Sequence, residues 1–148
     1  IKKSDIHHLI YLSLIRNKKM PKEKTLLPVI HKVTDSQVVK YSKSSGDINP
    51  IHLDPKYAST TQFGKRIAHG MLIISFISDF MYKNFGEIWL NSGGLKIKFK
   101  APVFLNDEIT TNGTIKSMEK KLELTKITCS VNCSNKDGVD VISGIAYC

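Results

Sequence analysis

The feature that most constrains the fold is the apolar segment from Gly70 to Phe85, whose apolar residues surround the whole circumference of a helix. A surface helix would confine such residues to one stripe, so this helix must be covered on nearly every side. Its longest apolar run, residues 71–80, is interrupted by two serines and an aspartate. The run is also shorter than the roughly 20 apolar residues that cross a bilayer. We therefore expect a buried central helix, ended by Gly86, and no membrane span.

After this helix the apolar pattern changes to a period of two, which is typical of half-buried strands. Leu95, Ile97 and Phe99 alternate with three lysines. Residues 102–107 predict a bend, and residues 108–117 and 122–132 predict two longer strands. Residues 135–138, Asn-Lys-Asp-Gly, are a hairpin signal that closes onto a last strand over 139–147. An antiparallel sheet curling around the apolar helix satisfies this order, and the predicted class is α+β.

The residues before the apolar helix predict one strand, over 26–33, and two shorter helices. Thr34 and Gln37 have the spacing of a capping box, which starts a helix that ends before Gly46. Asp54 and Pro55 form a second start signal, because Asp caps a helix and Pro is favoured at its first position. The residues between these helices, and residues 60–65, are predicted to be loops.

The length of 148 residues fits one domain with a sizeable core. Residues 1–25 are basic and irregular, so we expect an N-terminal extension there and a folded domain over 26–148. The extension faintly resembles a signal peptide but has no cleavage site of small residues, and we expect a cytoplasmic protein. Three cysteines, at 129, 133 and 148, lack the spacing of a disulfide framework and a partner histidine cluster. They are predicted to be buried thiols, without disulfides or zinc.

The formal net charge of +9 suggests an anionic partner. Among the 22 basic residues only Arg16 and Arg66 are arginines, and no aromatic residues are interleaved with a basic stripe. Nucleic-acid recognition favours arginine forks, so we expect no nucleic-acid partner. The lysines either reflect a lysine-rich source or raise a positive potential that attracts an acidic ligand.

A carboxylate and an imidazole, Asp47 and His52, lie five residues apart with Pro50 between them. In a loop stiffened by proline, both side chains can converge on one water molecule. One group can then remove a proton from water while the other protonates a neighbouring carbon, as hydration of an activated double bond requires. Asn49 could hold either side chain in position. The alternative is a structural turn, in which Asp47 caps backbone amides and His52 has no chemical role.

The residues Ile67-Ala-His-Gly70 come directly before the apolar helix. A glycine at a helix N-terminus lets a ligand approach, and the free amides with the positive end of the dipole attract negative charge. The Gly70 N–H could therefore stabilise the oxygen of a thioester enolate. Alternatively, Gly70 only permits close packing, and His69 is a capping or core histidine.

Two segments carry a family resemblance, Tyr41–Ala58 (YSKSSGDINPIHLDPKYA) and Phe63–Met71 (FGKRIAHGM). Both resemble the signature of the MaoC-like family, which holds the (R)-specific enoyl-CoA hydratases and the 3-hydroxyacyl-thioester dehydratases. The resemblance extends over roughly residues 26–147. It implies a hot-dog fold, in which the antiparallel sheet wraps around the long central helix, and a homodimer or a dimer of dimers.

By motif position, the resemblance implies that Asp47 and His52 are catalytic and that Gly70 is the oxyanion donor. Asn49, Ser45 and His69 are expected to support them. The side chains that could contact the substrate are Phe63, Met71, Ile74, Phe76 and Lys98. The apolar ones are candidates to line the acyl site or plain core residues, and the lysine could meet a diphosphate or lie on a solvated face.

The activity that the resemblance implies is the reversible hydration of a trans-2-enoyl-CoA to the (R)-3-hydroxyacyl-CoA. No metal or redox cofactor is expected, because the thioester itself activates the double bond. One alternative is a dehydratase of fatty-acid synthesis, working on a thioester of acyl carrier protein. A second alternative, of a different class, is a module that binds acyl thioesters without catalysis.

Overall fold

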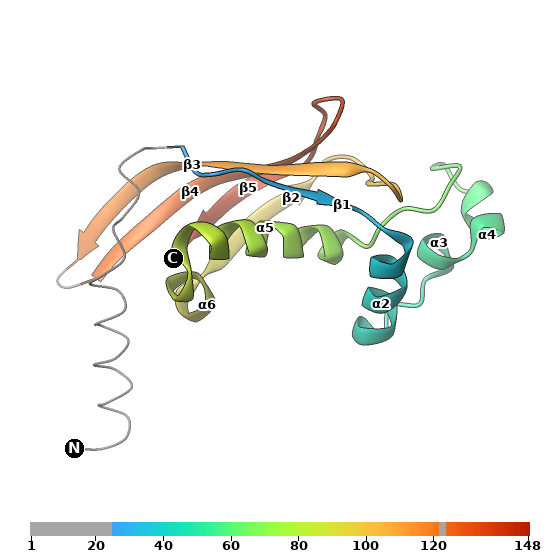
Figure 1. Cartoon of the computed structure of the whole chain (residues 1–148), viewed down its shortest axis with the longest axis horizontal. Helices are drawn as coiled ribbons and strands as arrows, with labels where there is room; N and C mark the ends of the chain where they lie inside the picture. Colours follow the sequence, from blue (N-terminus) through green and yellow to red (C-terminus); the bar gives the residue numbers. More distant parts are fainter. Residues whose placement is uncertain (1–24, 122–123) are drawn as a thin grey trace, which may run out of the picture.

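The computed structural model of the protein describes residues 25–121 and 124–148, in which five strands form one antiparallel sheet (Figure 1). The strands lie in the order β1-β3-β4-β5-β2, so β1 and β2 are the two edges. Their bounds are β1 (Val29–Lys32), β2 (Gly94–Phe99), β3 (Glu108–Lys121), β4 (Leu124–Asn135) and β5 (Asp140–Tyr147). The predicted sequence of one strand before the apolar helix and four antiparallel strands after it is confirmed within the described residues. The predicted extension, by contrast, lies outside them apart from Thr25.

Five helices accompany the sheet in the described part of the chain. They are α2 (Asp35–Ser45), α3 (Pro50–Leu53), α4 (Pro55–Ser59), α5 (Gly70–Phe85) and α6 (Glu87–Ser92). Helix α5 runs along the concave side of the sheet, and α2, α3 and α4 gather beyond its N-terminal end (Figure 1). The fold is the hot-dog fold that the resemblance implies.

The predicted helix boundaries are confirmed at α2. The Gln37 N–H donates to the Thr34 hydroxyl and the Thr34 N–H donates to the Gln37 side chain, which completes the capping box. The helix ends at Gly46, whose φ of +77° is a left-handed conformation that favours glycine. Asp54 caps α4 through the N–H groups of Lys56 and Tyr57, as its position before Pro55 predicts.

The prediction that Asp47 to His52 form a loop throughout is wrong for His52. Asn49 caps a single helical turn, α3, and His52 lies inside that turn. The reason is Pro50, which is excluded from a helix interior but favoured at the first helical position. The turn therefore begins at Pro50, where we had expected the helical conformation to be broken.

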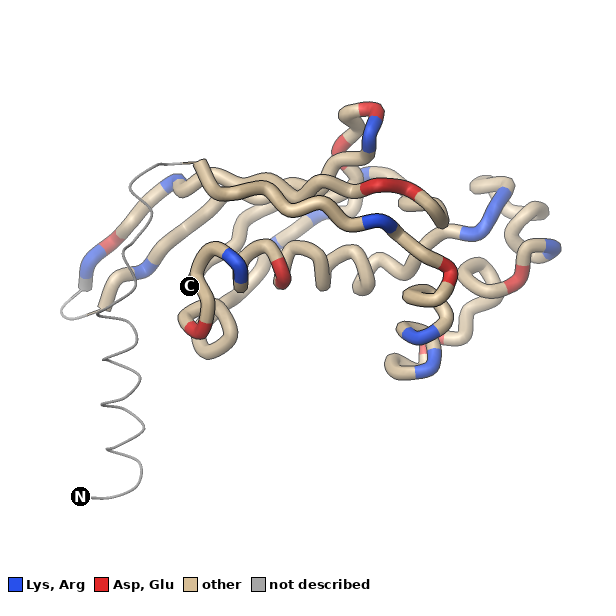
Figure 2. The backbone as a smooth tube through the Cα atoms, viewed as in Figure 1, with Lys and Arg blue, Asp and Glu red and all other residues tan. Residues whose placement is uncertain are grey.

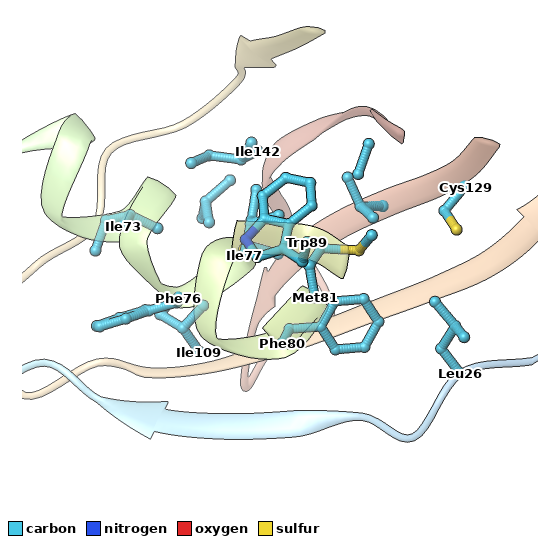
Figure 3. Packing of buried hydrophobic residues seen from close by; sticks show 14 of the residues in the cluster. Leu26, Ile73, Phe76, Ile77, Phe80, Met81, Trp89, Ile109, Cys129 and Ile142 are labelled. Atoms are coloured by element: carbon cyan, nitrogen blue, oxygen red, sulfur yellow. The ribbon is translucent and has the colours of Figure 1, made fainter. Parts of the chain in front are cut away.

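The inward face of α5 and the concave face of the sheet form the core (Figure 3). Phe80, Ile77 and Met81 are fully buried there against sheet residues such as Ile109 and Ile142. Each such side chain contributes about 1.5–3 kcal/mol through the apolar area that folding removes from water.

The expectation that α5 is covered on nearly every side is wrong for the described part of the chain. Met71 is 58% exposed and Tyr82 is 43% exposed, because the sheet covers only one side of the helix. The short helix α6 was not predicted at all. It lies between Gly86 and Gly93, and six residues are too few to show a helical period.

The lysines are scattered (Figure 2) and the cysteines are buried, as the sequence predicts. Lysines and arginines lie on many elements and form no single stripe in the view of Figure 2. All three cysteines are free and buried. Burial raises the pKa of Cys129 and Cys148 to about 11, which keeps these thiols protonated. No helix in the described residues is long and apolar enough to cross a membrane.

Candidate active site

The backbone of Asp47 is held by the C-terminal end of α2. The Ser42 hydroxyl donates to the Asp47 carbonyl at 2.7 Å, and the Asp47 N–H donates to the Ser45 hydroxyl at 3.2 Å. The Ser45 hydroxyl donates in turn to the Tyr41 carbonyl. The Asn49 N–H donates to Asp47 Oδ1 at 3.2 Å and limits the rotation of the carboxylate. One carboxylate oxygen, Oδ2, is left to face His52.

Asn49 supports this arrangement through both its backbone N–H and its side chain. Its side-chain Oδ1 accepts from the Ile51 N–H at 3.1 Å and so caps α3, the turn that carries His52. The Asn49 side chain therefore sets the start of the turn, while its N–H orients Asp47. Among the described residues, no hydrogen bond joins the Asn49 side chain to the side chain of Asp47 or His52.

The His52 ring is oriented by a backbone carbonyl. Nδ1 lies 2.9 Å from the Ile67 carbonyl, which can only accept, so Nδ1 carries the proton. The neutral ring then presents its lone pair on Nε2, which lies 4.0 Å from Asp47 Oδ2. This separation is too long for a direct hydrogen bond. A water oxygen beside the two atoms can hydrogen-bond to both.

His69 lies behind the pair and is 1% exposed. Its Nε2 donates to the Asp47 carbonyl at 3.1 Å, and its ring packs against His52 in a tilted arrangement with 3.8 Å between centroids. Burial lowers the pKa of His69, outweighing the hydrogen bond to Asp47, which raises it. His69 is therefore a neutral platform that supports His52 and holds the backbone of Asp47. Its other nitrogen, Nδ1, is buried without a hydrogen-bond partner among the described residues.

Asp47, His52 and His69 also offer three possible metal-ligating atoms, which lie within 4.8 Å of one another. The two imidazole planes are inclined by 30°. Nε2 of His69 donates to the Asp47 carbonyl and Nδ1 of His52 donates to the Ile67 carbonyl, and a nitrogen that carries a proton has no lone pair for an ion. These hydrogen bonds leave Nε2 of His52 facing Asp47, an arrangement suited to proton transfer.

A cavity of about 350 Å³ opens beside His52 and Gly70. The Gly70 N–H, at the start of the 16-residue helix α5, makes no hydrogen bond within the described residues, so it is available to a ligand. A Cβ at position 70 would lie 2.8 Å from the ring of Phe99, which also lines the cavity. The remaining lining is mostly apolar and comprises Phe63, Ile67, Ala68, Ile73, Lys100, Ala101, Pro102, Val103 and Ile142.

Only some of the expected substrate contacts line this cavity. Phe63 does, whereas Met71 is exposed and Phe76 is buried against His31, with 4.3 Å between ring centroids. Ile74 is half-buried beside the core and Lys98 is exposed on β2. Neither Ile74 nor Lys98 is part of the lining.

Sequence reasoning missed Ile73, Phe99, Lys100, Val103 and Ile142. The spacing of three from Gly70 to Ile73 places both residues on one face of a helix, and this signal could have found Ile73. No local signal places residues 99–103 and 142 beside Gly70, because the register of the sheet brings them there.

The site can be compared with known proteins. A family model described as a MaoC like domain matches residues 16–136. An (R)-specific enoyl-CoA hydratase from Rhodospirillum rubrum is 38% identical over 104 residues, covering 67% of this chain and 70% of the relative. One from Aeromonas caviae is 33% identical over 99 residues, covering 65% and 72%. The structure of an unliganded R-hydratase from Pseudomonas aeruginosa has a TM-score of 0.72 at 27% identity and covers 90% of this chain and 82% of that one.

Proposed function

The chain belongs to the MaoC-like domain family, and on this premise we propose that it reversibly adds water to a trans-2-enoyl thioester. The product is the (R)-3-hydroxyacyl thioester, as the names of the (R)-specific relatives suggest. A hydratase and a dehydratase catalyse the same reaction in opposite directions, and the chemistry of the family is that of a hydro-lyase. The observation that carries the proposal is the pair of facing atoms, Asp47 Oδ2 and His52 Nε2, which lie 4.0 Å apart beside a cavity lined by His52 and Gly70.

The Asp47–His52 pair moves the protons. One member enters the step unprotonated and takes a proton from water as the water oxygen bonds to C3 of the enoyl group, while the other enters it protonated and delivers its proton to C2. One O–H bond and the C=C π bond break, while C3–O and C2–H bonds form, so the proton content of the pair is unchanged. His52 takes part through Nε2, because Nδ1 is committed to the Ile67 carbonyl. The roles of acid and base belong to the pair as a whole.

Gly70 supplies the electrostatic part of the mechanism. When water adds at C3, negative charge moves to the thioester oxygen as an enolate develops. A free N–H at the first position of α5, reinforced by the helix dipole, can donate to that oxygen. The thioester carbonyl is conjugated with the double bond and activates it, so the reaction as proposed needs no metal or redox cofactor.

The apolar cavity suits the acyl group of the substrate. Its lining combines buried side chains, such as Ile73 and Ile142, with more exposed ones, such as Phe99. We assign the buried part to the acyl chain and the exposed part to the thioester arm. Lys100 also lines the cavity and is a better candidate than Lys98 to meet a phosphate of coenzyme A.

We also propose that the protein works as a homodimer joined along β2. Among residues 25–121 and 124–148 this strand pairs with β5 alone, so its other row of backbone groups is an open sheet edge there. Phe99 is 57% exposed at the end of this edge, next to the cavity. Light scattering coupled to size exclusion should give the mass of two chains, and a mass of one chain at all concentrations would contradict the proposal.

The hydratase proposal is tested with crotonyl-CoA, following the loss of enoyl absorbance. Asp47→Asn and His52→Gln keep the shape of each side chain, and either should lower kcat by about 10²–10⁴. Asp54→Asn, which changes a carboxylate that caps α4 outside the cavity, is the matched control. Full activity in either catalytic variant would refute the assignment.

Two further outcomes separate the other functions. Faster turnover with a thioester of acyl carrier protein than with coenzyme A would identify a dehydratase of fatty-acid synthesis. A wild-type protein that binds crotonyl-CoA by calorimetry but never hydrates it would be a binding module.

A further inference from the structure

Arg66 makes two hydrogen bonds that the mechanism above does not use. Its Nε donates to the carbonyl of His52 at 2.6 Å, and its Nη2 donates to Asp35 Oδ1 at 2.7 Å. The Arg66 side chain is 16% exposed, and Asp35 lies in the first turn of α2. A single guanidinium thus connects the backbone of a catalytic residue to the N-terminal end of α2.

The residue after Arg66 strengthens this connection. The Ile67 N–H lies 3.4 Å from the carbonyl of Ile51, and the Ile67 carbonyl accepts from His52 Nδ1 at 2.9 Å. His52 is therefore held twice, at its carbonyl by Arg66 and at its ring by Ile67. Both contacts come from one dipeptide, Arg66-Ile67.

The other end of α2 holds the other member of the pair. Ser42, which is 3% exposed, donates to the carbonyl of Asp47. Helix α2 is 11 residues long and is capped at both ends, by the Thr34 box and by Gly46. A capped helix of this length is a stiff rod of about 16 Å. One end of the rod holds His52 through Arg66, and the other holds Asp47 through Ser42.

We propose that Arg66 is a positioning residue which, through α2, fixes the separation between Asp47 Oδ2 and His52 Nε2. This inference rests on the proposed function, because the separation matters only if the two atoms share one water. A displacement of about 1 Å in a catalytic group can lower a rate by about 10²-fold, so a rigid link of this kind has a large effect on kcat.

The residue type agrees with the role. Arg66 is one of two arginines among 22 basic residues, and it occupies a position where two acceptors in different directions must be met at once. The planar fork of a guanidinium does this with fixed geometry, whereas the ammonium of lysine is a single point on a flexible chain. Lysine at position 66 would keep the ion pair with Asp35 and release the carbonyl of His52.

Arg66→Lys should therefore lower kcat for crotonyl-CoA by about 10-fold and change KM by less than about 2-fold, since the cavity lining is untouched. Asp35→Asn loosens the anchor of Arg66 and should lower kcat by about 3-fold. Lys40→Gln removes an exposed cation from the same helix and is the matched control. If kcat of Arg66→Lys stays within 2-fold of Lys40→Gln, the proposal is wrong.

A double variant tests the role of α2 itself. Ser42→Ala alone should lower kcat by about 10-fold, because it frees the other end. If both contacts act on one separation, Arg66→Lys with Ser42→Ala should lose little more than either single variant, because the second loss frees nothing further. Losses that multiply to about 100-fold would overturn the proposal.

The test still decides if Arg66→Lys does not fold or if the wild type has no hydratase activity. If Arg66→Lys does not fold, as circular dichroism would reveal, Asp35→Asn carries the test alone, because Asp35 is 62% exposed, and unchanged kcat there would overturn the proposal. If the wild type lacks hydratase activity, the proposed function fails separately. Crystal structures of wild type and Arg66→Lys then decide, since an unchanged Asp47–His52 separation would refute the positioning role.

Discussion

Gly70 combines two functions that a side chain would disturb. Its N–H is free at the start of α5, and its Cα lies against the ring of Phe99 (Figure 1 shows the start of α5). A Cβ added there would lie 2.8 and 2.9 Å from two ring carbons of Phe99. Either the ring or the start of the helix must move, and both border the cavity.

Gly70→Ala keeps the N–H but can displace it through the contact of the new Cβ with Phe99. We therefore expect kcat/KM for crotonyl-CoA to fall by about 10–100-fold, a part of the about 10²–10³ that loss of one oxyanion donor costs in rate. Stability should change little, because Phe99 is exposed enough to swing away. Phe99→Leu in the same background should return part of the activity. Ser75→Ala, on the exposed face of α5, is the control. Wild-type activity in Gly70→Ala would show that close packing of position 70 against Phe99 is not needed for the reaction.

His69 predicts how stability depends on pH. Burial lowers the pKa of His69 below its usual value of 6.5, so the unfolded chain binds this proton more readily than the folded one. The contribution of neutral His69 is then fully present above pH 6.5 and is lost as the pH falls below it. His69→Gln keeps a donor for the Asp47 carbonyl but does not titrate. Its Tm should fall less than that of wild type between pH 7.5 and pH 5, and equal falls would contradict this account.

For single residues, the sequence predicted which ones lie together at the site but not which of their atoms make the contacts. Asp47, His52 and Gly70 followed from a motif. That Asn49 acts through its N–H, and that His69 holds a carbonyl, depends on a helical turn at Pro50 that we had expected to be a loop. Arg66 was recognised only as a rare arginine, because its partner Asp35 lies 31 residues away.

Among the elements, β1 and α5 are joined by a polar contact inside an apolar layer. His31 Nε2 lies 3.0 Å from Asp79 Oδ2, and the His31 ring stacks on Phe76 with planes only 8° apart. Lys83, one turn further along α5, also reaches Asp79 at 2.7 Å. The edge strand is short, with four residues, so this contact is a substantial part of what holds it to the helix.

Asp79→Asn should lower the free energy of unfolding by about 1–2 kcal/mol, since it leaves a partly buried imidazole with a weaker partner. Lys83→Gln breaks only an exposed pair on one helix, which is worth about 0.3–0.5 kcal/mol. Urea denaturation of both variants measures the difference. A loss no larger in Asp79→Asn than in Lys83→Gln would show that the His31 contact is not what stabilises β1.

Element types were easier to predict than element environments. The capping box, the proline starts and the change of period identify α2, α4, α5 and β2 from neighbouring residues alone. The open face of α5 depends on how far the sheet reaches around the helix, which no residue of α5 specifies. Strands β3 and β4 extend beyond their apolar pattern because each continues to pair with the other, from Ile109↔Asn135 to Lys121↔Leu124.

For the whole molecule, the three cysteines report on global unfolding. All are buried and free, and burial raises the pKa of Cys129 and Cys148 to about 11, so little thiolate exists at pH 8. A disulfide reagent should react with none of them in the native protein and with all three in denaturant. Fast reaction of one thiol in the native state would show that its part of the sheet opens locally.

The arrangement of the whole sheet was predicted only through the family resemblance. Local patterns indicate a run of antiparallel strands, but β2 pairs with β5, the last strand, and β1 pairs with β3. These pairings join residues such as Phe99 and Ile142, which are far apart in the chain. The pairings depend on which apolar strand faces pack against α5, and no single segment of the sequence specifies this.

The residues proposed to transfer protons and the residues that form most of the apolar wall of the cavity come from different parts of the chain. The proposed acid–base pair and its supports come from residues 35–70, whereas much of the apolar wall comes from residues 99–103 and from Ile142. Substitutions at Val103 or Ile142 can therefore change the acyl groups that fit without moving Asp47 relative to His52. In evolutionary terms, such a chain can acquire new substrates through its sheet while the reaction itself stays intact.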